Sequence, residues 1–134
     1  MEKLPALNSD LVNEFVRVAH SDLKQVKELL AQEPRLVNAT WDWGGGDWET
    51  GLDAAAHMGR RDIAEYLLEQ GAHINIFAAA MLGKVEIVKA ILTDNPAARH
   101  NPGAHGIPLI VHAQQGGEKA QRVIEYLESL NRNE

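Results

Sequence analysis

The sequence predicts an all-α fold built from four helix-turn-helix units, and three observations support this prediction. Apolar residues recur at steps of three and four in short bursts, the spacing of one face of an α-helix. The apolar/polar alternation typical of strands is almost absent. Each burst also follows a shorter apolar or alanine-rich stretch and a break at a small residue. The breaks are Ser21, Gly59, Gly83 and Gly116.

Each expected unit pairs a short first helix with a longer, more aliphatic second helix. Such a pair cannot bury its apolar face alone, so the units are expected to stack into one domain, residues 1–134. The approximate unit boundaries are 11–40, 41–75, 76–100 and 101–134. The second helices carry the four bursts: Val26, Leu29 and Leu30; Ile63, Leu67 and Leu68; Ile87, Val88, Ile91 and Leu92; and Val123, Ile124, Leu127 and Leu130.

The segment GLDAAAHMGRRDIAEYLLEQGAHIN, residues 51–75, resembles an ankyrin repeat. The breaks are 38, 24 and 33 residues apart, and the last interval equals the ankyrin period of about 33. Four positions match the ankyrin signature: Thr50, Leu52, Ala55 and Ala56. Three positions depart from it: Gly51, Asp53 and His73. The fourth unit keeps Pro108 and Leu109, with a second helix that starts two or three residues late, and the resemblance extends over about residues 11–130.

This resemblance implies a short ankyrin-like solenoid and a non-catalytic role in binding proteins or peptides. The connections between units differ in length. Residues 38–51, NATWDWGGGDWETG, are long enough for a hairpin finger between units one and two. Units two and three follow each other almost directly, and a proline- and glycine-rich loop, TDNPAARHNPGAHGI, connects units three and four.

All three tryptophans lie in the finger, although aromatic residues make up only 5% of the chain. A four-residue loop from Gly44 to Asp47 would place Trp41, Trp43 and Trp48 on one face, whereas a three-residue loop would split them between faces. The shared-face register is the one expected. Rings on one face would either seal the alanine-rich helices or form a binding platform.

The two residues before each turn are expected to face the concave groove of the solenoid. In the middle units these residues are apolar, and an exposed apolar strip marks a contact site. The missing finger between units two and three leaves inward packing of the strip as the alternative. The predicted partner-binding residues are Trp41, Trp43, Trp48, Glu49, His57, Met58, Met81 and Leu82.

A small-ligand binder or enzyme is the second functional hypothesis. It would use the finger tryptophans with Asp42, Asp47, Glu49, Asp53 and His57. Acids in such positions more often cap turns and helix starts, and no nucleophile, phosphate-loop or dinucleotide motif is present. We therefore predict that the chain is not an enzyme and has no cofactor.

No metal site is predicted either. The six histidines form no helical pair at a spacing of four and no HExxH motif. His100, His105 and His112 are close in sequence, but no acidic third ligand is evident beside them.

The composition of the chain disfavours or excludes several kinds of binding partner and site. Hydrophobic residues make up 45% of the 134 residues, and a net charge of −6 disfavours binding to nucleic acid or anionic membranes. The absence of cysteine removes disulfides and thiolate metal sites. No segment approaches the roughly 18 apolar residues of a membrane span. We expect a soluble cytoplasmic protein that binds a protein or peptide partner and is a monomer or weak homodimer.

Overall fold

A computed structural model of the chain describes residues 2–132, so the first residue and the last two of the predicted domain lie outside the description. The described residues form four pairs of α-helices. The helices are α1 (Ser9–Val18), α2 (Leu23–Gln32), α3 (Gly51–His57), α4 (Arg61–Glu69), α5 (Ile76–Leu82), α6 (Val85–Asp94), α7 (Leu109–Gln115) and α8 (Gln121–Arg132).

The fold is mostly helical but is not strictly all-α, because a small antiparallel sheet interrupts it. Strands β1 (Thr40–Asp42) and β2 (Trp48–Thr50) form the finger as a two-stranded hairpin. The run of glycines between β1 and β2 disfavours a helix in this connection. Hydrogen bonds between the two strands satisfy their backbone N–H and C=O groups. Short 3-10 helices occupy the connections: η1 (Pro34–Asn38), η2 (Pro96–His100), η3 (Ala104–Gly106) and η4 (Gly117–Ala120).

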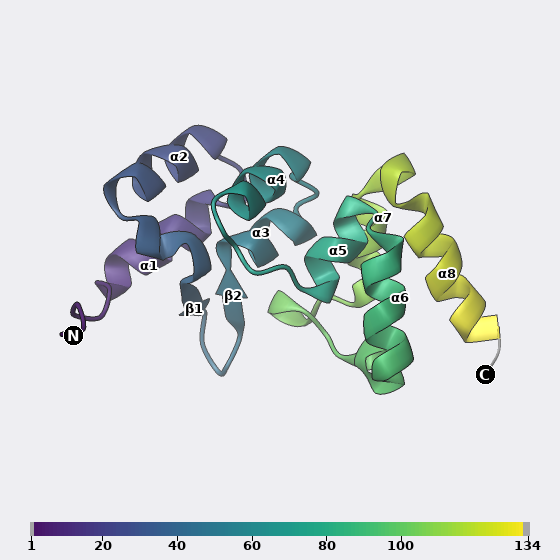
Figure 1. Ribbon diagram of the computed structural model, residues 1–134. Helices are drawn as coiled ribbons and strands as arrows, with labels where there is room; N and C mark the ends of the chain where they lie inside the picture. Colours follow the sequence, from purple (N-terminus) through teal and green to yellow (C-terminus); the bar gives the residue numbers. More distant parts are fainter. Residues whose placement is uncertain (1, 133–134) are drawn as a thin grey trace.

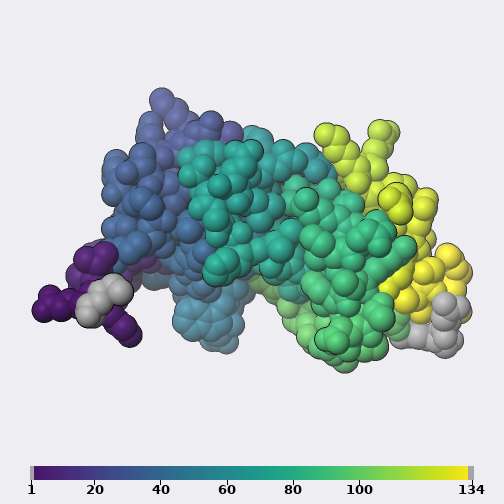
Figure 2. All heavy atoms as spheres, in the orientation of Figure 1, coloured from purple at the N-terminus to yellow at the C-terminus, as the bar shows by residue number. Residues whose placement is uncertain are grey.

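The helix pairs follow one another along the molecule, from α1 and α2 at one end to α7 and α8 at the other (Figure 1). Each first helix packs against the next first helix, as α1 with α3, α3 with α5 and α5 with α7. Alanines make this close approach possible: Ala54, Ala55, Ala56, Ala78, Ala79 and Ala80 are all fully buried. The hairpin projects from one edge of this row and stands out as a knob in the space-filling view (Figure 2).

Two hydrophobic cores lie along the row. The first core joins the two N-terminal helix pairs and includes Phe15, Leu52, Ile63 and Leu67, with Met81 from α5. The second core joins the two C-terminal pairs, centred on Val88, Leu109 and Val123. Each of the four bursts contributes buried side chains to one of these cores, as Val26, Ile63, Val88 and Val123 show.

The predicted helix boundaries are largely confirmed. Gly83 caps α5, and Gly59 follows the C-cap residue of α3, both in the left-handed region with φ of 80° and 66°. Thr50 and Asp53 form a capping box at the start of α3. The late start of α8 is also confirmed, because η4 intervenes after α7. No helix among the described residues is both long enough and apolar enough to cross a bilayer.

Candidate functional site

The hairpin register decides which finger side chains act together. Trp41 pairs with Glu49 and Asp42 with Trp48, and the Trp43 amide donates to the Asp47 carbonyl oxygen at 3.0 Å. The loop is therefore the three-residue stretch 44–46, so the expected four-residue loop is wrong. All three loop glycines have positive φ, and the Asp42 carboxylate accepts from the Gly44 and Gly46 amides at 2.8 and 3.1 Å. Only glycine adopts such a run at little cost.

The three-residue loop splits the tryptophans between the two faces of the hairpin. Trp41, Trp43 and Glu49 share one face, and Trp48 lies on the other with Asp42, so the expectation of one shared aromatic face is wrong. Trp41 packs against the first core. The Trp43 ring lies edge-on to the Trp41 ring, with 6.5 Å between the ring centroids. Trp48 remains 59% exposed. Trp41 thus helps to seal the helices, whereas Trp43, which is 39% exposed, and Trp48 both keep part of their rings in solvent.

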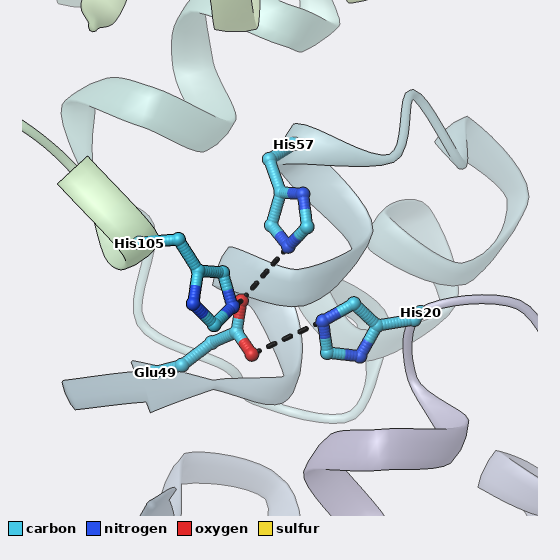
Figure 3. Close-up of side chains that lie close together, drawn as sticks. All are labelled: His20, Glu49, His57 and His105. Carbon is cyan, nitrogen blue, oxygen red and sulfur yellow. Dashed lines mark hydrogen bonds and ion pairs between the residues drawn. The ribbon is translucent and has the colours of Figure 1, made fainter. Parts of the chain in front are cut away.

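Glu49 lies at the centre of a histidine cluster that the sequence analysis missed. Its side chain is fully buried and points towards three imidazoles (Figure 3). His20 Nε2 lies 3.1 Å from one carboxylate oxygen. His57 and His105 Nε2 lie 2.9 and 3.1 Å from the other. The Trp43 indole N–H donates to the first oxygen at 2.9 Å.

Four separate segments deliver these side chains. His20 follows the end of α1, His57 is the last residue of α3, Glu49 is the middle residue of β2, and His105 lies in η3. His20 and His57 stand just before the turn in units one and two, so aligning the units shows that these two are neighbours. Nothing in the spacing of His105, 85 positions after His20, indicates that it joins them.

His105 is held in a backbone conformation that is uncommon outside glycine, with φ of 59°. The two oxygens of the Asp47 carboxylate hold the backbone and the ring of His105. One oxygen accepts from the His105 amide at 2.7 Å, and the other lies 2.8 Å from His105 Nδ1. The finger therefore fastens the loop between α6 and α7 to the N-terminal half of the molecule.

The electrostatics of the cluster favour a charged carboxylate. Burial by itself disfavours the ionised form of Glu49, but the hydrogen bonds with His20 and His57 outweigh it, so the pKa of Glu49 falls well below its usual range. The hydrogen bond with Glu49 raises the pKa of His20 despite partial burial of the ring. A buried negative charge therefore sits among groups that carry or attract positive charge.

The predicted apolar strip is only partly at the surface. Met58 is 46% exposed, but Met81 is fully buried and Leu82 is buried as well. Both belong to the first core, so their prediction as surface contacts is wrong. Because no finger separates units two and three, α5 packs directly on the first core, and both side chains are buried there. Inward packing was the alternative that the sequence left open.

An open cleft lies between the hairpin and the loop that precedes α7. Its volume is about 800 Å³, and Trp48, Gly45 and Gly46 line it from the finger. Asp47 also lines it from the finger, and the remaining lining residues come from the helices and the loop before α7: Asp53, Asn75, Phe77, Pro102, Gly103, Ala104, His105 and Gly106. The cleft thus combines an exposed aromatic ring with several residues that have little or no side chain, a surface that an extended chain can approach closely.

The acidic set of the second hypothesis is not assembled into one pocket. Asp42 caps the hairpin turn, and Asp53 completes the α3 capping box and accepts from Asn75 at 2.7 Å. The set is divided instead: Glu49 contacts His57 and Trp43, whereas Asp47, Asp53 and Trp48 line the cleft. Of the loop histidines considered for a metal, His105 joins the cluster. His112 instead packs on Phe77, 4.8 Å between ring centroids. His100 lies in η2.

One comparison agrees with the resemblance, over a single repeat. The family model described as Ankyrin repeat matches residues 47–77, which cover β2, α3, α4 and the start of α5. No curated protein matches the chain. Ankyrin repeats generally mediate protein–protein binding and are typically not catalytic.

Proposed function

We propose that this ankyrin-repeat protein is a non-catalytic module that binds an extended segment of a partner protein in the cleft between its hairpin and the loop before α7. The observation that carries the proposal is Trp48, which is 59% exposed and lines the cleft. A large exposed aromatic ring is costly to leave in water and is the commonest kind of anchor at protein interfaces.

The shape and chemistry of the cleft favour a peptide over a small molecule. It is open rather than enclosed, and Trp48 and Phe77 offer two aromatic surfaces to an apolar side chain of the partner. Gly45 and Gly46 have no side chain, and a Cβ at either position would meet nothing within 4 Å, so an extended chain can approach the backbone closely there. Trp41, Trp43 and Glu49 lie on the opposite face of the hairpin from Trp48, where His57 contacts Glu49 at 2.9 Å, so these four residues support the surface from behind. Met58, which is 46% exposed just after α3, is proposed as a further contact outside the cleft.

The wider properties follow from the same proposal. The four stacked helix pairs are a short ankyrin-like solenoid in a single domain, with repeats close to residues 11–40, 41–75, 76–100 and 101–134. The protein acts in the cytoplasm as a monomer or weak homodimer. Its net charge of −6 supports a protein partner over nucleic acid. No observation favours the enzyme hypothesis.

The test uses peptides selected from a random display library on the immobilised protein. A selected peptide is then titrated against the wild type, Trp48→Ala and Leu4→Ala. Leu4 is a matched control because it is also an exposed apolar side chain but does not line the cleft. We expect Trp48→Ala to weaken binding by at least about 1 kcal/mol, roughly fivefold, and Leu4→Ala to leave it unchanged. Equal affinity in all three proteins would contradict the proposal.

A further inference from the structure

We propose that His20, Glu49, His57 and His105 form a binding site for one divalent transition-metal ion, with Zn²⁺ as the best match to the ligand set. The four potential ligand atoms all lie within 4.8 Å of one another. Tetrahedral zinc with bonds of about 2.0–2.2 Å places its ligand atoms roughly 3.4 Å apart. The Glu49 oxygens already lie 2.9–3.1 Å from the imidazole nitrogens, so completing the site requires the imidazoles to close around the ion while the carboxylate draws back slightly.

The hydrogen bonds on the far side of two imidazoles select the form that binds metal. His20 Nδ1 lies 2.9 Å from the Val16 carbonyl oxygen, which can only accept, so this nitrogen carries the hydrogen. His105 Nδ1 likewise faces the Asp47 carboxylate at 2.8 Å. In the neutral form of each ring, Nε2 then carries the lone pair that a metal ion needs, whereas in the protonated form Nε2–H donates to Glu49. A metal ion that displaces these protons would keep a positive charge beside the buried Glu49 carboxylate.

The surroundings match the outer shell of known metal sites. A metal-binding histidine nearly always donates its second N–H to a carboxylate or a backbone carbonyl, and His105 and His20 have these two kinds of partner. Trp43 holds the Glu49 carboxylate through its indole N–H. His105 adopts its uncommon positive φ in the contact with Asp47 that aims Nε2 at the cluster.

The ligand types decide which ion fits. Three imidazole nitrogens and one carboxylate suit zinc and its transition-metal neighbours, whereas magnesium and calcium require mostly oxygen ligands. Four protein ligands correspond to a structural zinc site rather than a catalytic one. The ion would tie the end of α1, the hairpin, the end of α3 and the η3 loop together, and so would fix the position of the finger (Figure 3).

The experiment removes metals from the purified full chain with a chelator and titrates it with Zn²⁺ alone by calorimetry. Co²⁺ is added in parallel, because tetrahedral coordination by nitrogen and oxygen gives it an intense visible absorption. The wild type is expected to bind one Zn²⁺ per chain. His105→Asn removes a ligand while keeping a residue that tolerates positive φ, and its affinity is expected to be at least about 100-fold weaker.

His73→Asn is the matched control, because His73 is an exposed histidine outside the cluster. It is expected to bind Zn²⁺ as the wild type does. Circular dichroism checks that each variant is folded, and Glu49→Gln replaces His105→Asn in the comparison if the latter is not. Absence of stoichiometric Zn²⁺ binding by the wild type, or equal affinity in the ligand variant and His73→Asn, would overturn the proposal and leave a hydrogen-bonded cluster that needs no metal.

Discussion

The close approach of the third and fourth helix pairs predicts an unusually large effect of one methyl group. Gly83 ends α5 with φ of 80°, and a Cβ at this position would overlap the backbone carbonyl of Lys119 in η4. Backbone atoms of a packed helical turn cannot rotate away as a flexible side chain can. Gly83→Ala must therefore either push η4 off α5 or distort the turn.

The magnitude has two parts, and a second glycine separates them. Gly71 also has positive φ, 100°, but a Cβ there would meet no atom within 4 Å. Gly71→Ala is expected to cost about 1 kcal/mol, since strain in the left-handed region exceeds the gain from a stiffer unfolded chain. Overpacking against backbone adds about 1–3 kcal/mol. Gly83→Ala is therefore expected to cost about 2–4 kcal/mol.

Urea denaturation followed by circular dichroism measures both losses on the same scale. The two variants share the substitution and the sign of φ, so the difference between their unfolding free energies reports the contact with Lys119. A difference below about 0.5 kcal/mol would refute the reasoning, because α5 and η4 would then not be packed against each other as described.

Two further predictions concern the loop before α7 and the buried histidine that follows it. Asp47→Ala removes both acceptors that hold His105, and amide hydrogen exchange over residues 104–106 is expected to accelerate about fivefold or more, for a loss of about 1 kcal/mol. Asp94→Ala, at the end of α6, should leave this exchange unchanged, and an equal response in both variants would refute the fastening role. Burial lowers the pKa of His112, so the folded state binds its proton less readily than the unfolded chain. Its contribution to stability is therefore complete well above the ordinary pKa of 6.5 and is lost as the pH falls below it. Urea midpoints from pH 7.5 to 5 should fall less for His112→Gln than for the wild type, and identical pH dependence would count against the buried neutral form.

The helical part of the fold could be predicted because its signals are local. A burst such as Ile63 and Leu67 repeats at helical spacing, and the capping box of Thr50 and Asp53 lies within four residues. Gly83 marks its turn by a backbone requirement that other residues meet poorly. Each of these signals depends on neighbours in sequence, so no tertiary information was needed to place the element.

The register of the hairpin finger and the burial of the predicted apolar strip could not be predicted from such local signals. Loops of three and four residues both suit Gly44–Gly46, and one residue of slippage moves Trp48 to the opposite face. The Asp42 carboxylate accepts a hydrogen bond from the Gly44 amide and so stabilises the three-residue loop. Met81 is apolar in either environment, so its burial follows from how closely α5 packs on the first core, which no local pattern records.

The histidine cluster shows the same limit more strongly. His20 and His57 occupy similar places in successive units, and this repetition was visible in the sequence. Glu49 joins them only in the three-residue register, and His105 arrives from a long loop through a contact with Asp47 that depends on the tertiary fold. Side chains from four segments carry no common spacing, which explains why sequence motifs for metals found nothing.

The central claim is that a partner segment binds in the cleft between the hairpin and the loop before α7. Chemical-shift mapping of the ¹⁵N-labelled chain with a selected peptide tests it most directly. The claim predicts that the largest shifts lie at the amides of residues 45–48 and 103–106 and at the Trp48 indole. Shifts concentrated on α2, α4 and α6, with the cleft amides unmoved, would contradict it.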